Sequence, residues 1–113
     1  MFNLNAEIET LLKNFSCPVS FMFYEGSADT YITYQQTHIE DTLAGDDEVL
    51  AGIVAYDFDV YSKGNYISVI NSLLTIMIGA GWTYQPSMDS PDLYERDTKF
   101  FHKTICLAKE SEV

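Results

Sequence analysis

The sequence has little positive charge. Six Lys and Arg residues stand against seventeen Asp and Glu residues among 113, which gives a net charge of −11. Proteins hold phosphate backbones mainly through Lys and Arg, and anionic membrane surfaces attract the same residues. We therefore expect neither sequence-specific nor other nucleic-acid binding, and no binding to a membrane surface. Basic patches on other proteins remain possible partners.

Cysteine and long apolar runs are also scarce. Cys17 and Cys106 are the only two cysteines, whereas a small secreted scaffold usually carries four or more. The start of the chain has no basic and apolar leader. The most apolar stretch, Tyr66–Trp82, contains Ser and Asn and is short for a membrane span. These features predict a soluble cytosolic protein with reduced thiols.

What the sequence does contain is enough apolar material for one domain, residues 1–113. Hydrophobic residues make up 47% of the chain and aromatic residues 14%, so a packed core is expected over most of its length. No repeat, low-complexity tract or change in composition divides it.

Two helices are predicted. Apolar residues recur at the spacing of a helix face near the N-terminus, at Leu4, Ile8, Leu11 and Phe15. Pro18 ends this pattern. A second helix is expected over Tyr66–Gly79, with Ser62 or Asn65 as its cap and Gly79 and Gly81 at its end.

Several strands are predicted around these helices. Val19–Tyr24 and Tyr31–Gln35 are rich in β-branched and aromatic residues and are separated by turn residues, which favours a hairpin. Ile53–Tyr61 alternates strictly between apolar and other residues, as expected for a strand with one buried face. Phe100–Lys109 is the last strand, and its mixed pattern predicts partial cover on both faces.

Two long connections complete the chain. Residues 38–52 are predicted to be an acidic loop, and residues 83–97 a loop or an irregular hairpin arm containing Pro86 and Pro91. Long loops in compact domains are usually functional or mobile. The expected order is α-β-β-β-α-β. The fold class is α+β, with a mostly antiparallel sheet of about four strands and both helices packed on one face.

The second helix has an unusual polar side. It carries the uncharged side chains Ser68, Asn71, Ser72 and Thr75 and has no Lys, Arg, Asp or Glu. A helix face in water normally carries charged residues. Two interpretations remain open: this face lies deep in its own domain, or a neighbouring subunit covers it. In the second case the candidate interface residues are these four together with Phe101 and Lys103 of the two-sided last strand.

The search for chemistry finds no active site. Asp57 and Asp59 share one strand face, about 7 Å apart, but no further oxygen ligands occur at a recognisable spacing, so a solvated strand face is favoured over a metal site. His102 lies in a strand without a metal-binding motif, which favours a structural hydrogen bond. The sequence therefore predicts no catalytic residue, no metal site and no cofactor.

Several short motifs occur together in an order that resembles a known family. They are Tyr31-Ile32-Thr33-Tyr34, the strand–helix junction Asp59–Tyr66, Gly81-Trp82, and Tyr94-Glu95-Arg96-Asp97-Thr98 followed by Phe101-His102-Lys103. In this order and spacing, over most of residues 15–107, the chain resembles the tail-completion proteins of long-tailed bacteriophages and prophages. These are also called tail terminators or tail-to-head joining proteins.

The resemblance implies an α+β fold, no enzymatic activity, and a ring commonly of six subunits. Such a ring caps the head-proximal end of the tail tube within the virion and is assembled in the cytoplasm of the bacterial host. Its implied partners are further copies of itself, the tail tube protein and the head completion or connector protein. DNA must slide through the tail, and a net charge of −11 suits a channel to which DNA does not stick.

Loop length and charge suggest which residues meet these partners. The candidate partner-facing residues are Asp41, Asp46, Asp47 and Glu48 in the acidic loop, and Tyr84 and Tyr94 in the second one.

Two other functions compete with this one. The same carboxylates suit an acidic inhibitor or immunity-type protein that blocks a basic site on a partner. A metal-dependent hydrolase built on Asp57, Asp59 and His102 is the third possibility.

Overall fold

The computed structural model describes residues 3–45 and 48–112, and for residues 41–45, 48–51 and 112 it describes the backbone alone. The chain is α+β. Its elements, in order, are α1 (Asn5–Leu11), β1 (Val19–Phe21), β2 (Thr30–Gly45), β3 (Glu48–Ser62), α2 (Tyr66–Gly79), β4 (Thr83–Tyr84), the 3-10 turn η1 (Pro86–Met88), β5 (Leu93–Glu95) and β6 (Phe100–Glu112).

The described residues form one sheet that is mostly antiparallel, as expected, but it has six strands where about four were expected. The strand order is β1-β2-β3-β6-β4, and β5 pairs with another part of β6. Only the β1–β2 pair is parallel. The predicted alternation of Ile53–Tyr61 is confirmed, since Val54, Tyr56, Phe58 and Val60 are all buried.

The expected hairpin over residues 19–35 is wrong. Val19 pairs with Ile32 and Phe21 with Tyr34 in parallel register. The chain leaves β1 through a turn at Met22 and returns through residues 23–29, where Tyr24 Oη accepts a hydrogen bond from the Ala28 amide at 3.2 Å. This connection carries the chain back to the start of the neighbouring strand, which a local pattern of apolar residues cannot reveal.

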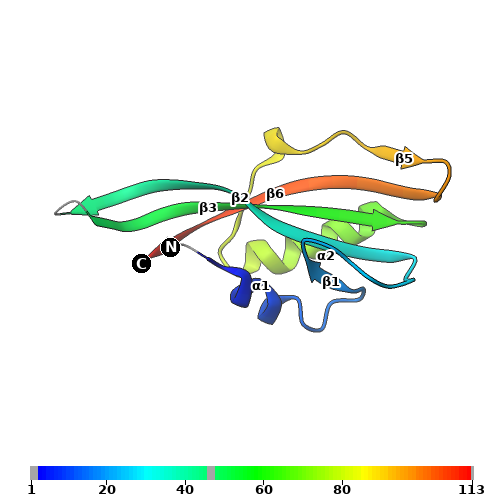
Figure 1. Ribbon diagram of the computed structural model, residues 1–113, viewed down its shortest axis with the longest axis horizontal. Helices are drawn as coiled ribbons and strands as arrows, with labels where there is room; N and C mark the ends of the chain where they lie inside the picture. Colours follow the sequence, from blue (N-terminus) through cyan, green and yellow to red (C-terminus); the bar gives the residue numbers. More distant parts are fainter. Residues whose placement is uncertain (1–2, 46–47, 113) are drawn as a thin grey trace.

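The expected acidic loop over residues 38–52 is also wrong, because most of it is a long hairpin. β2 and β3 stay paired from Thr30–Ser62 to Gly45–Glu48, with register shifts near Thr37, Thr42 and Leu43. The hairpin extends beyond the body as an arm (Figure 1), and the molecule measures 54 × 27 × 24 Å. The backbone hydrogen bonds between β2 and β3 continue from the buried part of the hairpin into the arm. The acidic sequence of the arm itself does not alternate between apolar and polar residues, as a half-buried strand would.

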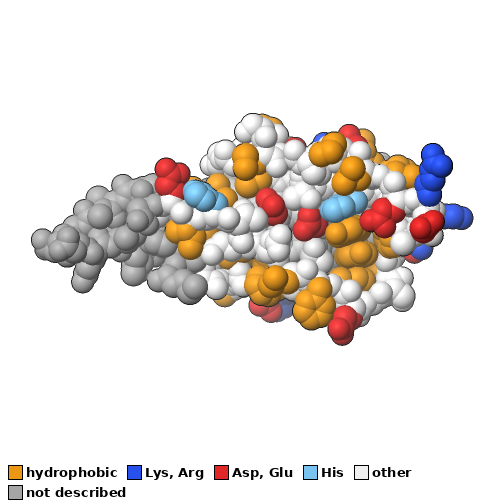
Figure 2. Space-filling model, turned by 45° about the horizontal axis from the view of Figure 1, so that its top comes forward, with side chains coloured by type: hydrophobic (Ala, Val, Ile, Leu, Met, Phe, Trp, Pro, Cys, Tyr) orange, Lys and Arg blue, Asp and Glu red, His pale blue; other side chains and the backbone are white. Residues whose placement is uncertain are grey.

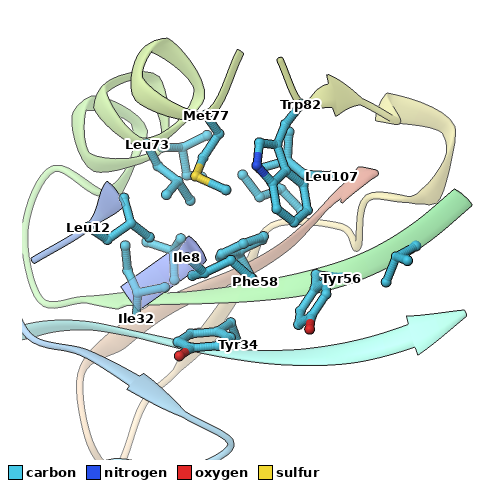
Figure 3. Packing of buried hydrophobic residues seen from close by; sticks show 14 residues of the cluster. Ile8, Leu12, Ile32, Tyr34, Tyr56, Phe58, Leu73, Met77, Trp82 and Leu107 are labelled. Atoms are coloured by element: carbon cyan, nitrogen blue, oxygen red, sulfur yellow. The ribbon is translucent and has the colours of Figure 1, made fainter. Parts of the chain in front are cut away.

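Both helices lie on one face of the sheet, as predicted (Figure 1). The core that they share with the sheet contains residues from α1, β2, β3, α2 and β6, among them Ile8, Ile32, Phe58, Leu73, Met77, Trp82 and Leu107 (Figure 3). The hydroxyl of buried Tyr56 fixes α1 to the sheet, because it donates to Asn5 Oδ1 at 2.6 Å and accepts from the Leu4 amide at 3.0 Å.

The ends of α2 agree with the sequence. Asn65 caps the helix, since its Oδ1 accepts a hydrogen bond from the Ser68 amide at 3.0 Å. The helix ends at Gly79, and Gly81 has a φ of +95°, which glycine adopts without a steric penalty. Within the described residues, no helix is long and apolar enough to cross a membrane.

Candidate functional site

The outer half of α2 is an uncharged surface that the described residues of this chain leave uncovered. Ser68, Asn71, Ser72 and Thr75 are all exposed, so the interpretation that this face lies deep in its own domain is wrong. Ile67 and Ile78 flank these residues and are 57% and 51% exposed. No charged residue occurs from Gly64 to Met88. A half-exposed helix without charge is unusual for a surface in water.

A groove lies beside this helix, where α2 faces β4 and β6. It has a volume of about 340 Å³, and α2 supplies most of its wall through Tyr66, Ile67, Ile70, Asn71 and Leu74, with Tyr84 from β4. Lys103 and Asp92, the two charged residues in its lining, form an ion pair, with Lys103 Nζ 3.2 Å from Asp92 Oδ1. Asn71 and Lys103, both candidate interface residues, thus line one groove.

Phe101 plays a different part from the one suggested by the pattern of the last strand. Its ring stacks on Tyr66 at a centroid distance of 5.2 Å and packs against Tyr94 at 4.8 Å. Phe101 is therefore half-buried within the chain itself and supports the groove from below α2. The predicted cover on both faces of β6 is confirmed at Ile105–Ala108, which are buried without exception.

The candidate partner-facing residues fall into three groups. Asp41 and Glu48 lie on β2 and β3 of the arm, whereas Asp46 and Asp47 lie outside the described residues. Tyr94, on β5, is half exposed. Tyr84 is tied into the chain, because its hydroxyl donates to Asp89 Oδ2. Burial first, and then this carboxylate, raise the pKa of Tyr84 to about 12.

The sheet face away from the helices brings together the residues of the hydrolase hypothesis. Asp59 Oδ1 accepts a hydrogen bond from the Thr104 hydroxyl and lies 3.4 Å from His102 Nε2. The His102 ring also stacks on Tyr61, with 4.2 Å between centroids. Among the described residues, no three His, Cys, Asp or Glu side chains are arranged to hold a metal ion. His102 thus has a hydrogen-bonding partner in Asp59, and its purely structural role stays a prediction.

Neither cysteine has the surroundings of a nucleophile. Both are free thiols, and Cys106 is buried opposite Asp57 in the β3–β6 register. Burial, followed by the charges of Asp57 and Asp89, raises the pKa of the Cys106 thiol. Burial also raises the pKa of Cys17 to about 11. The reactive form of cysteine is the thiolate, which both environments disfavour.

Asp57 provides a test of the electrostatics on this face. Burial first, and then repulsion by Asp59, raise its pKa above the usual range. A carboxyl whose pKa is higher in the folded state destabilises the fold while ionised, and this cost disappears as pH falls through the folded pKa. We expect Asp57→Asn to raise the melting temperature at pH 7 by a few degrees. The difference from wild type should shrink toward zero below about pH 4.

The control is Asp97→Asn, which removes an exposed carboxylate from the β5–β6 turn. Differential scanning calorimetry from pH 3 to pH 8 should show almost no change for it. If Asp57→Asn melted at a lower temperature than wild type at pH 7, ionised Asp57 would not be destabilising the fold.

One exposed apolar feature lies at the end of the strand that the sequence predicted over Val19–Tyr24, at Phe21 and Phe23. The structure exposes both, together with Met22 between them. Alternation along a strand puts Phe21 and Phe23 on one side and Met22 on the other, so the sequence indicated that at least one of the three lacks cover, but not which.

Charged side chains are distributed unevenly over the rest of the described surface. In Figure 2 the basic side chains are most prominent at the right-hand end of the molecule. Lys63 contributes a cation–π contact, since its Nζ lies 5.1 Å from the centroid of the Phe100 ring.

No family model matches the chain, and no curated protein matches its sequence. Its function is therefore inferred from its residues, charge and geometry.

Proposed function

We propose that this chain is a tail-completion protein of a long-tailed phage or prophage, which acts by assembly and not by catalysis. In this proposal its subunits form a ring that caps the head-proximal end of the tail tube and offers a surface to the head connector. The proposal is supported by the order of short motifs over residues 15–107, by the net charge of −11, and by the uncharged exposed face of α2.

The face of α2 is the observation that carries the proposal. Each subunit of a ring needs a contact between two different surfaces of neighbouring copies. Two copies that each carry a charge of −11 repel one another, so such a contact requires a surface free of like charge. The outer half of α2 has no charged residue and is open to a neighbour.

The hairpin arm supports a contact with the tube or the head. Strands β2 and β3 carry the chain well beyond the body (Figure 1), and Glu40, Asp41 and Glu48 lie on these strands. An arm of this kind reaches a neighbouring protein without moving the helices that would contact the next subunit. The segment 38–52, expected to meet a partner as a loop, would thus do so as a paired arm.

The first experiment measures the assembly of the purified protein. Light scattering after gel filtration and negative-stain images should show rings with a central hole, either in solution or on the ends of tubes grown from the tail tube protein of the same phage. Addition of the protein to growing tubes should stop their elongation. A protein that remains monomeric, leaves tubes uncapped and binds a basic nuclease would instead support the acidic-inhibitor function.

A charge placed on α2 makes this test specific. We expect Ser72→Glu to abolish rings and capping, because the contact would bury a carboxylate that has no partner of opposite charge. Its melting temperature should be unchanged, since Ser72 is exposed. Asn14→Glu adds the same charge at an exposed site after α1 and should assemble as wild type does. Rings formed equally well by Ser72→Glu would contradict the role of α2.

A further inference from the structure

An exposed apolar knob projects from the β1 edge of the sheet. It consists of Phe21, Met22 and Phe23, which are 46%, 57% and 66% exposed. The Phe21 ring rests partly on Tyr34, with 5.6 Å between centroids. None of the three residues is charged. The knob thus presents about half of its apolar surface to solvent, on a short edge strand of only three residues.

The backbone holds this knob in an unfavourable conformation. Met22 has a φ of +66°, and the Phe23 amide donates to the Phe21 carbonyl at 2.8 Å, which closes a tight three-residue turn. Turns of this kind with a positive φ are rare and strained, above all at a residue with a long side chain. The Met22 amide bonds to the Tyr34 carbonyl at 2.9 Å and keeps the turn in place. Strain that is held in this way is commonly found at binding sites.

The groove beside α2 lies on the opposite side of the fold from this knob. β1 is one end of the strand order, and β4, which contributes Tyr84 to the groove, is the other. In Figure 1, β1 lies at the lower side of the molecule and the segment that leads to β5 lies along the top. One molecule therefore carries an apolar projection at one edge and an apolar groove at the other, and cannot fill its own groove with its own knob.

We propose that the knob of one copy docks into the α2 groove of the next copy. This inference rests on the proposed ring and identifies its subunit contact. Charge selects a second copy as the occupant, since subunits of net charge −11 approach each other only through surfaces without like charge. The knob has no charge, and the two charged residues in the groove lining, Lys103 and Asp92, pair with each other. The carboxylate of Asp89 is hydrogen-bonded to the hydroxyl of Tyr84. A contact between two different surfaces continues from copy to copy, as a ring requires.

The size of the knob sets the strength of this contact. Side chains of this size have an area of about 150–250 Å² each, and the exposed fractions of the three residues therefore leave roughly 300 Å² of apolar surface available for contact. A stable interface buries about 800 Å² on each partner. The knob alone therefore gives weak association, and the flanking α2 face and the tail tube are needed to hold the ring together.

Cross-linking tests the contact directly. In a Cys17→Ser background, the double variant Met22→Cys/Asn71→Cys carries one thiol on the knob and one in the groove. At a protein concentration of roughly 100 µM, well above a dissociation constant in the micromolar range, oxidation should produce a ladder of covalent species larger than dimers. An equal mixture of the two single variants should stop at the dimer. In the control, Glu110→Cys replaces Asn71→Cys at an exposed site of β6 and should give no ladder.

Met22→Gly separates binding from folding. Glycine adopts a positive φ without penalty, so this variant should melt at or above the wild-type temperature while its self-association weakens at least tenfold. Ile67→Glu in the groove should weaken association to a similar degree. The double variant should be scarcely worse than either single one, because both substitutions remove the same contact.

The outcomes distinguish this inference from the proposed function. Rings without a Met22–Asn71 ladder, or rings that Met22→Gly leaves intact, would overturn the knob contact and leave the ring proposal standing. Dimers of the single Met22→Cys variant would show that knobs meet each other, which also overturns it. A protein that is monomeric both alone and with tail tubes would overturn both.

Discussion

Replacement of Phe58 by alanine is expected to lower the free energy of unfolding by about 3–5 kcal/mol. Phe58 is completely buried at the centre of the sheet, with its ring 6.0 Å from that of Tyr34 and 6.4 Å from that of Trp82 (Figure 3). The substitution removes the ring and leaves a cavity between the sheet and α2. Domains of this size are stable by about 5–15 kcal/mol, so the variant should lose a large part of its stability.

Urea denaturation followed by circular dichroism measures this effect. The matched control is Phe23→Ala, which makes the same chemical change where the ring is 66% exposed. It should alter stability by no more than about 0.5 kcal/mol. Phe58→Leu keeps most of the volume and should cost about 1.5 kcal/mol or less. A loss below about 1 kcal/mol in Phe58→Ala would be incompatible with a cavity at this position.

Replacement of Glu7 by alanine is expected to cost about 1–3 kcal/mol, because it leaves a buried donor without a partner. Glu7 Oε2 accepts from Trp82 Nε1 at 3.1 Å, and its Oε1 accepts from Lys109 Nζ at 2.6 Å. Lys109 also donates to the Ala80 carbonyl at 3.2 Å. One carboxylate of α1 thus joins the end of α2 to β6, and Trp82 itself is only 2% exposed.

Glu7→Gln separates the two contacts of this carboxylate. Glutamine keeps an acceptor for Trp82 but loses the ion pair with Lys109. In this pair the Glu7 side chain is 36% exposed and the Lys109 side chain is 25% exposed. Exposed pairs contribute about 1 kcal/mol or less, so this variant should be much milder than Glu7→Ala. Trp82 is the only tryptophan, so fluorescence emission followed during urea denaturation reports the environment of its indole and the unfolding of both variants. Equal losses for the two variants would show that the ion pair, and not the indole bond, dominates.

Phe58 and Glu7 both stabilise the packing of the helices on the sheet, and this packing positions the proposed contact surfaces. α2 is held by Leu73 and Met77 against the sheet, and the same helix turns its uncharged half outward. Loss of the Phe58 ring is therefore expected to weaken assembly as well as folding, whereas Ser72→Glu should affect assembly alone. Comparison of the two variants separates the interface from its support.

The elements that the sequence predicted well are those whose apolar pattern is local. α2 shows the helical period, an Asn65 cap and a glycine end, and all three were found where the pattern placed them. The strand over 53–61 alternates because one face packs on the helices and the other does not. Phe100–Lys109 was recognised as a strand for the same reason, although β6 continues to Glu112.

The elements that were missed depend on neighbours far along the chain. The outer part of the β2–β3 arm is rich in acids and has no alternation, and it is a strand because the paired chain beside it continues. The parallel register of β1 depends on a return through residues 23–29 that no local signal records. The exposure of Phe21 and Phe23 follows from the turn at Met22, not from their hydrophobicity.

The sequence by itself determined the α+β class, the net charge of −11 and the absence of charge along α2, since these depend only on which residues are present and on their local spacing. The tertiary structure alone decided which half of α2 meets water, that the acidic segment forms an arm, and that the knob and the groove lie at opposite edges of the sheet. The physical reason is that burial and strand pairing are set by residues distant in the chain. An uncharged face becomes a candidate interface only when the fold leaves it uncovered.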